Sequence, residues 1–337
     1  MTFHSIDDVF DAFKGLKVII IGDVMLDEFH HGSVSRMSPE NSSTPILSQI
    51  KTERRLGGAA NVAANIQALG GIPYLISPIG MDYAGQQLVS LMESDGLSTE
   101  GLIECYDRKT TVKSRFYEDS KQVLRVDFED DFELTQAQND ELQYLFSAEI
   151  SSSDLVLFQD YDKGCLNARN IPTIIAATKG HHVKVAIDPK FKNFWSYQNV
   201  DLIKPNFLEF VKAFNLVIDE SNVEIMQETA AKYLQEQSIG RIQVSLSGQG
   251  MFHADLSNQG ILPAHPRTVL DVSGAGDTVF AVSALCLALG TSSGFAAELS
   301  NIAGGLVCEE FGTAIIDIAQ LKNEASGSAN LNGGIQA

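Results

Sequence analysis

The 337-residue sequence has few of the residues and runs that mark several classes of protein. Its four cysteines have neither metal-ligand spacing nor the pattern of a disulfide framework, and its seven histidines form no His-Glu-x-x-His motif. The apolar segment 281–289 is too short to span a bilayer. Acidic residues precede any apolar run at the N-terminus, which argues against a secretory signal. We therefore expect a cytoplasmic protein without a membrane segment.

Basic residues are also scarce. The chain has 24 Lys and Arg against 43 Asp and Glu, a net charge of −19 at pH 7. This charge disfavours nucleic acid and anionic membranes as partners, so any phosphate-bearing ligand must be held by local donors. With 44% hydrophobic and 20% charged residues, the chain has the composition of an ordinary globular protein with a sizeable core. Its length fits one large α/β domain or two smaller ones.

Short apolar runs alternate with helical patterns along the chain, which predicts a mainly parallel sheet with helices on both faces. The expected strands are Val18–Ile21, Tyr74–Ser77, Leu155–Phe158, Val183–Ile187, Leu202–Lys204 and Ile242–Leu246. The expected helices are Gly58–Leu69, Tyr83–Glu93, Ala137–Ser147, Ile171–Thr178, Val223–Glu236, Thr278–Leu289 and Gly294–Val307.

Two segments break this alternation. Phe29–Ile50 and Thr110–Phe128 alternate polar and apolar residues, which is typical of half-exposed antiparallel strands. We expect them to form a small projecting sheet with an apolar face made of Val112, Phe116, Val123 and Val126. The segment 325–337 is rich in Gly, Ser and Asn and is expected to be a disordered tail.

The stretch Asp271–Asp277 (DVSGAGD) runs directly into an apolar helical segment. Small residues at a helix start leave backbone N–H groups free at the positive end of the helix dipole, which suits an anion. Gly274, Ala275 and Gly276 are the expected anion cradle, and Asp277 is the expected general base for an alcohol beside a bound phosphate. A simple turn followed by a cap is the alternative for this motif alone.

Polar residues follow the first strand and open the next helix. Asp23 and Asp27 come directly after Val18–Ile21, where ligands of open α/β sheets bind, and could accept hydrogen bonds from vicinal sugar hydroxyls or cap a turn. Gly57, Gly58 and Asn61 permit close approach of a ligand or tight helix packing.

Two further strand ends carry candidate nucleotide residues. Asn206 and Glu209 could order water around a divalent ion or form a capping box. Glycines and hydroxyls follow the strand at Ile242–Leu246 and could line a nucleotide or form a hairpin turn into Met251–Ala254; the candidates are Ser245, Ser247, Gly248 and Gly250.

Basic residues crowd the segment 108–125 of this otherwise acidic chain. Lys113 and Arg115 share a strand face, and Lys190 follows another strand. We expect these three to bind a phosphate already present on the acceptor, whereas charges that protect an edge strand are the alternative for the others.

Taken together, these motifs resemble those of the ribokinase-like (PfkB) sugar kinases, from about Lys17 to Leu321. Within that family the chain is similar to the kinases of D-glycero-β-D-manno-heptose 7-phosphate. The supporting segments are GDVMLDEF, SRMSPE, RRLGGAANVAANIQALG, Gln159–Gly164, Ile187–Lys190 and DVSGAGDTV. The chain departs from the heptose-kinase pattern at Asn41–Thr44, at Gln159 where a Ser is usual, and at Asp162 where an Ala is usual.

The resemblance implies a ribokinase-like α/β domain over residues 1–324, with a small β-sheet lid. It implies ATP and Mg²⁺ as cosubstrates, with a monovalent cation such as K⁺ near the anion loop, where Asp271 is a possible ligand. By position, Asp277 is the base, Asp23, Asp27, Gly57, Gly58 and Asn61 contact the sugar, and Asn206 and Glu209 lie on the metal–phosphate side. Lids of related kinases cover each other, which implies a homodimer.

The activity implied is ATP-dependent phosphorylation of the heptose phosphate to its 1,7-bisphosphate, an ADP-heptose and lipopolysaccharide precursor. A kinase of ribose or fructose and a non-catalytic sugar-binding regulator remain alternatives. A dinucleotide-dependent oxidoreductase fits poorly, because no G-x-G-x-x-G follows the first strand. No H-x-G-H motif occurs either, so we expect no nucleotidylyltransferase domain in this sequence.

Overall fold

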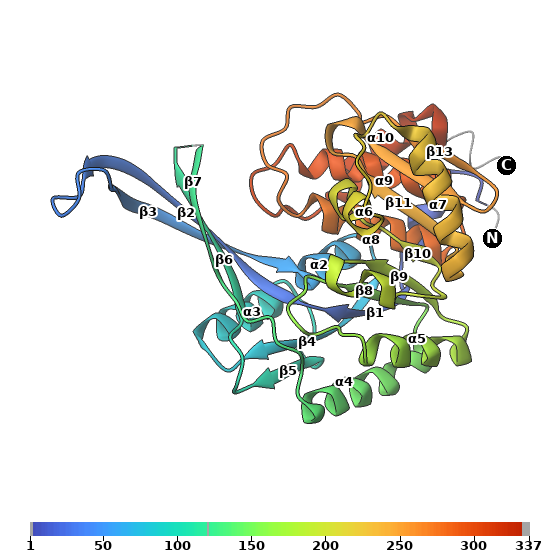
Figure 1. Ribbon diagram of the computed structural model, residues 1–337, viewed down its shortest axis with the longest axis horizontal. Helices are drawn as coiled ribbons and strands as arrows, with labels where there is room; N and C mark the ends of the chain where they lie inside the picture. The colour runs from blue at the N-terminus through green and yellow to red at the C-terminus, as the bar shows by residue number, and fades with distance from the viewer. Residues whose placement is uncertain (1–2, 120, 332–337) are drawn as a thin grey trace.

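The computed structural model describes residues 3–119 and 121–331. Its body is built on a nine-stranded sheet in the order β13-β12-β11-β10-β9-β8-β1-β4-β5 (Figure 1). Neighbouring strands from β11 to β5 pair in parallel, and the hairpin β11–β12–β13 adds an antiparallel edge. The strands are β1 (Lys17–Gly22), β4 (Ile72–Gly80), β5 (Leu102–Cys105), β8 (Leu155–Gln159), β9 (Lys184–Asp188), β10 (Leu202–Ile203), β11 (Arg241–Ser245), β12 (Met251–Asp255) and β13 (Gln259–Leu262).

Helices cover both faces of this sheet because its central strands are apolar on both sides. In β1, Val18 and Ile20 belong to one buried cluster and Ile19 and Ile21 to the other. The first cluster includes α1 (Ile6–Phe13), α2 (Ala59–Ala68), α3 (Tyr83–Ser94), α8 (Ala275–Ala288), α9 (Ser293–Val307) and α10 (Ile318–Gly327). The second includes α4 (Gln136–Glu149), α5 (Asn170–His181), α6 (Phe207–Ala213) and α7 (Val223–Gln237).

The predicted fold class, a mainly parallel sheet flanked by helices with a second small sheet, is therefore confirmed. Each expected strand and helix lies within a few residues of an observed one. The elements that were not predicted include the helices α1 and α10, the short strand β5 and the edge strand β13. Within the described residues, no helix combines the length and apolarity that a bilayer crossing requires.

The second sheet, which we call the lid, has the strand order β3-β2-β6-β7 and projects from the body (Figure 1). It comprises β2 (Val24–Met37), β3 (Pro45–Gly58), β6 (Thr111–Glu118) and β7 (Lys121–Phe128). The long β2–β3 hairpin begins directly after β1, so the first residues of the lid lie at the edge of the body. The sequence predicted this sheet but started its first strand too late. The two hairpins are antiparallel as predicted, whereas β2 and β6 pair in parallel.

The apolar row on one lid face differs in part from the prediction. Val112 lies opposite Phe128, and Phe116 lies opposite Leu124, so these side chains share a face with Val126. The predicted Val123 does not belong to this row, because the register shifts at Phe116 and makes Val123 the extra residue. Leu124 and Phe128 are exposed.

The C-terminal segment is also more structured than predicted. Helix α10 continues to Gly327, past the expected start of the tail at Ala325, and the Leu331 side chain is buried. The prediction of a disordered tail from Ala325 is therefore wrong at its beginning. The rest of that predicted tail, residues 332–337, lies outside the described residues.

Candidate active site

Asp277 lies in the first turn of α8, pointed at the carboxyl end of the sheet. Its carboxylate accepts hydrogen bonds from the Asn61 amide on Oδ2 (2.9 Å), and from the Gln159 amide (2.9 Å) and the Tyr161 hydroxyl (2.8 Å) on Oδ1. The side chain is 3% exposed. Burial raises the pKa of Asp277 to about 6, although the bonds from Asn61 and Tyr161 act in the opposite direction. A carboxylate with this pKa can accept a proton close to neutral pH.

The residues predicted as an anion cradle form the turn that opens α8, just before Asp277. Gly274 is the N-cap of α8 with φ of 78°, a left-handed conformation that glycine adopts without strain. A Cβ there would come within 2.8 Å of the Asn61 amide nitrogen. A Cβ on Gly276 would meet no described atom within 4 Å, so the backbone at Gly276 is open to a ligand. The Ala275 N–H donates to the Val272 carbonyl oxygen (3.3 Å), so the N–H groups of Gly274 and Gly276 are the better candidates for an anion at this helix start.

Asp23 has a different environment from the open ligand expected. It is 3% exposed, and its carboxylate accepts hydrogen bonds from the backbone N–H groups of Tyr161 (2.9 Å), Lys163 (3.1 Å) and Cys165 (3.1 Å). Burial raises the pKa of Asp23, and these three bonds oppose the rise. The geometry makes Asp23 a clamp for the loop 161–165.

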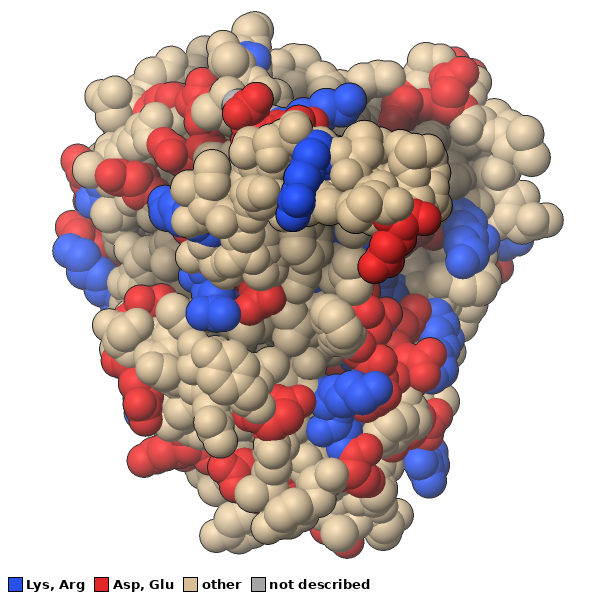
Figure 2. Space-filling model, turned by 90° about the vertical axis from the view of Figure 1, so that its left-hand side faces the viewer, with Lys and Arg blue, Asp and Glu red and all other residues tan. Residues whose placement is uncertain are grey.

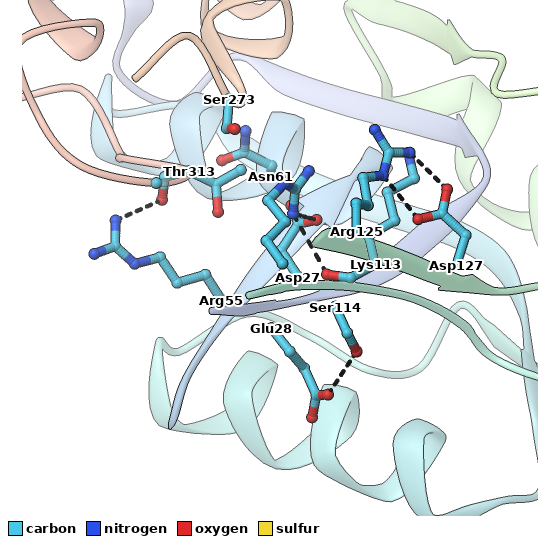
Figure 3. Close-up of polar contacts among 12 residues, drawn as sticks. Asp27, Glu28, Arg55, Asn61, Lys113, Ser114, Arg125, Asp127, Ser273 and Thr313 are labelled. Atoms are coloured by element: carbon cyan, nitrogen blue, oxygen red, sulfur yellow. Dashed lines mark hydrogen bonds and ion pairs between the residues drawn. The ribbon is translucent and has the colours of Figure 1, made fainter. Parts of the chain in front are cut away.

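Asp27 lies at the root of the lid, where it is buried and paired with Arg115 (2.7 Å). A Cβ on Gly57 would come within 2.5 Å of Asp27 Oδ2, and one on Gly58 within 2.5 Å of the Asp23 carbonyl oxygen. Both glycines therefore permit the end of β3 to pack closely against the two aspartates. Figure 3 shows Asp27 where the lid meets the body, near Asn61.

Lys113 of β6 lies beside the same space (Figure 3). Its ammonium group is 4.7 Å from the centre of the Tyr161 ring and forms no ion pair with any residue in the described part of the chain. Burial lowers the pKa of Lys113, with Asp27 offsetting part of the shift. A partly desolvated cation without an anionic partner is a good binding group for an anionic ligand.

Lys190 lies two residues after the end of β9, near the other candidate residues. Its ammonium group pairs with Glu209 and lies 5.0 Å from the centre of the Tyr161 ring. Burial opposes the charged form, but Asp188 and Glu209 raise the pKa of Lys190. Glu209 and Asn206 form a reciprocal capping box at the start of α6, as the capping alternative predicted.

The loop after β11 lies beside this helix start, because Ser245 forms a parallel bridge with Asn206. Residues 247–249 form a short 3-10 turn into β12, so the hairpin alternative is confirmed for this segment. Gly250 has φ of 107°, and a Cβ there would come within 2.0 Å of the Leu262 carbonyl oxygen. Ser247 and Gly248 lie on this turn, and both are exposed.

Comparison with known proteins identifies the family to which this chain belongs. The family described as pfkB family carbohydrate kinase matches residues 17–319. The chain belongs to the pfkB family of carbohydrate kinases. The predicted resemblance to ribokinase-like sugar kinases is therefore confirmed, and with it a fold that supports ATP-dependent phosphorylation of sugars.

Individual relatives agree with this membership of the pfkB family. The chain is 38% identical over 327 residues to the bifunctional protein HldE of Caulobacter vibrioides, covering 96% of this chain and 66% of that protein. It is 35% identical to the D-beta-D-heptose 7-phosphate kinase of Bordetella bronchiseptica, covering 92% of this chain and 96% of that one. Phosphofructokinase-2 of Escherichia coli, in complex with potassium, superposes with a TM-score of 0.79 at 19% identity, covering 96% of this chain and 100% of that one.

Membership of the pfkB family implies ATP and Mg²⁺, and the residues fit a metal that arrives with the nucleotide. Among residues 3–119 and 121–331, no group of three His, Cys, Asp or Glu side chains could hold a metal ion. Glu209 is already paired with Lys190 and caps α6. Protein oxygens at this site could therefore orient water around Mg²⁺ rather than form a closed cage.

Sequence reasoning did not predict two groups in this pfkB site. Gln159 and Tyr161, at and after the end of β8, both donate to Asp277. A buried ion pair of Lys204 with Asp188 (3.1 Å) lies behind them, and the Gln159 amide lies 3.4 Å from Asp188. The position of Gln159 at a strand end was a usable signal, but its partner is 118 residues away in the sequence.

On the face of the molecule that Figure 2 shows, Lys and Arg lie among Asp and Glu and form no continuous basic surface. That phosphate ligands are held by local groups, such as the α8 cradle and Lys113, stays a prediction drawn from the net charge of −19.

Proposed function

We propose that this chain transfers the γ-phosphoryl group of ATP to the anomeric hydroxyl of D-glycero-β-D-manno-heptose 7-phosphate, forming the 1,7-bisphosphate and ADP. The observation that carries this proposal is the Bordetella relative named as a D-beta-D-heptose 7-phosphate kinase, whose length the chain covers to 96%. The HldE relatives support it as well, although the chain spans only 66% and 64% of the first two. The product would be a precursor of ADP-heptose and lipopolysaccharide.

Asp277 and the α8 cradle carry the chemistry. Asp277 takes the proton of the acceptor hydroxyl as its oxygen attacks the γ-phosphorus, and the bond to the bridging β–γ oxygen breaks to release ADP. The N–H groups of Gly274 and Gly276 stabilise the charge on the transferring group, and Ala275, whose N–H donates to the Val272 carbonyl oxygen, shapes the turn between them. Mg²⁺, when bound with the nucleotide, neutralises phosphate charge.

The acceptor lies between lid and body in this proposal. Asp27 and Asn61, with the backbone at Gly57 and Gly58, contact the sugar hydroxyls, and Asp23 holds the loop beside them. The cations Lys113, Arg115 and Lys190 face the phosphate of the acceptor. Lys113 is the principal group that binds this phosphate, because Arg115 and Lys190 already have carboxylate partners.

The nucleotide occupies the adjacent side. Ser245, Ser247, Gly248 and Gly250 line it, while Asn206 and Glu209 orient the water shell of Mg²⁺. Asp271 is the proposed ligand of a monovalent cation: its two oxygens accept N–H bonds from Ser273 (2.9 Å) and Gly312 (3.1 Å), joining two loops beside the cradle. Replacing K⁺ by tetramethylammonium in the assay tests this assignment.

A homodimer through the lid completes the proposal. Its contact face is the row of Val112, Phe116, Leu124, Val126 and Phe128, of which Leu124 and Phe128 are exposed. An exposed apolar sheet face of this kind is normally covered by a partner. A second copy of the chain presents the same row, as a two-fold interface requires.

ATP consumption by the purified chain over a panel of sugars and sugar phosphates tests the function. We expect turnover with the heptose 7-phosphate and a large preference for sugar phosphates over free sugars. Equal efficiency with ribose or fructose would assign a plain sugar kinase instead. Binding of sugar without ATP consumption would assign a regulator on the same fold.

A further inference from the structure

The hydrogen bonds at Asp277 are distributed unequally between its two oxygens. A carboxylate has about four acceptor positions, two on each oxygen. Within residues 3–119 and 121–331, Oδ1 accepts from both Gln159 and Tyr161, and Oδ2 accepts only from Asn61. The open position on this carboxylate therefore lies on Oδ2.

We propose that Tyr161 is a positioning residue for the base: with Gln159 it occupies Oδ1 of Asp277, so that Oδ2 is the oxygen that receives the acceptor's proton. This inference rests on the proposed function, since it assumes that Asp277 takes a proton in turnover. Neither side chain touches the reacting atoms in this arrangement. Each acts by fixing the orientation of the Asp277 carboxylate.

The loop that carries Tyr161 is held firmly enough for this task. Asp23 accepts the N–H groups of Tyr161, Lys163 and Cys165, and Arg108 donates to the Lys163 carbonyl oxygen. Asp162 has φ of 57°, and its N–H donates to Asp160 (2.9 Å). With the backbone fixed at so many points, the Tyr161 ring has little freedom to leave Asp277.

The Tyr161 hydroxyl is a donor in this pair. Burial raises the pKa of Tyr161 well above its usual value, and Asp277 adds to the rise, so the phenol stays protonated. The ammonium groups of Lys113 and Lys190, 4.7 and 5.0 Å from the ring centre, favour donation further. A proton held on Tyr161 favours the ionised form of the carboxylate.

Removing the hydroxyl should therefore raise the pKa of Asp277. Other charged groups face this carboxylate from neighbouring elements and stay in place in the variant: Asp27 of β2, Asp188 of β9, Lys113 of β6, and Lys190. A hydrogen bond to a charged group corresponds to an upward shift of about one pH unit when it is lost. Gln159→Met removes the second donor to Oδ1 and should shift the pKa in the same direction.

The chain offers a matched control. Tyr197 is a buried tyrosine whose hydroxyl donates to the buried Asp160 (2.7 Å), so Tyr197→Phe breaks the same kind of bond away from Asp277. Carbon-13 NMR titration of the aspartate carboxyls, with Asp277 assigned by Asp277→Asn, measures the shift without any need for turnover. The pH profile of kcat/KM gives a second, independent measurement of the acidic limb.

We expect Tyr161→Phe to move both the NMR titration of Asp277 and the acidic limb upward, with the plateau above about pH 8 little changed, and Tyr197→Phe to move neither. An Asp277 titration that is unchanged in Tyr161→Phe, or equally shifted in Tyr197→Phe, would overturn the proposal. Faster turnover of Tyr161→Phe at all pH values would also overturn it, since Tyr161 would then obstruct the base. The NMR shift without kinase activity would instead contradict the proposed function alone.

Discussion

The buried carboxylate on the body and the ammonium group on the lid are held in opposite ways. Asp277 has three donors from α2 and from the end of β8, and the surrounding helices leave it 3% exposed. Lys113 is half-buried and has no anionic partner in the part of the chain that the structure describes. The body thus presents a reactive group that is already oriented, whereas the lid presents a charge that only a ligand can satisfy.

The largest effect is expected when the carboxylate of Asp277 is replaced. Asp277→Asn keeps the shape of the side chain and cannot accept a proton, so turnover should fall by about 10²–10⁴-fold with ATP affinity little changed. Steady-state kinetics and calorimetric ATP titration measure the two effects. The control is Asp201→Asn at the amino end of the strands, where Asp201 pairs with Lys184 (2.7 Å). Turnover of Asp277→Asn close to that of the wild type would remove Asp277 from the mechanism.

The second test removes the unpaired cation of the lid. Lys113→Met keeps the length of the side chain, and it should lower kcat/KM for a sugar phosphate by about tenfold to a hundredfold. The same variant should have almost no effect with a free sugar. Lys121→Met, at the exposed start of β7, is the matched control. An equal loss with both acceptors would place Lys113 outside the phosphate site.

The third test uses pH. The ionised form of Asp277 is the base, so protonation near its pKa of about 6 should abolish activity as the pH falls. Activity at pH 5 should be about tenfold below the plateau. A profile of kcat/KM, with circular dichroism at each pH to check folding, measures this. An acidic limb near pH 4 would indicate that burial does not control this carboxyl.

The smallest effect on turnover is expected at the outer face of the lid. Leu124→Glu places a charge in the exposed apolar row, so it should dissociate a lid-mediated dimer while each chain keeps its base and cradle. Sedimentation velocity at micromolar concentration measures the association. Leu256→Glu, at an exposed turn beyond β12, is the control. A wild type that is monomeric at that concentration would contradict the interface itself.

The body and the lid also differ in how far the sequence could predict them. Strand-helix alternation and DVSGAGD were sufficient to predict the sheet and the helix start that carries Asp277, because periodicity and small residues act locally. The register of β6 and β7 was not predictable, since one extra residue, Val123, changes which side chains share a face. Asp23 followed the right strand, but its three partners lie in a loop about which local pattern says nothing.

The hydrogen-bond partners of Asp277 are synthesised well before Asp277 itself. Asn61 and Asp277 are separated by 216 residues, and Tyr161 and Asp277 by 116. At translation rates of about 5–20 residues per second, the base leaves the ribosome roughly 10–40 seconds after Asn61. Throughout that interval the Asn61 amide lacks the acceptor that it has in the folded protein, and the Gln159 amide lacks it for the last 118 residues. A nascent chain can therefore build most of the parallel sheet, yet it has no catalytic centre until α8 has been made.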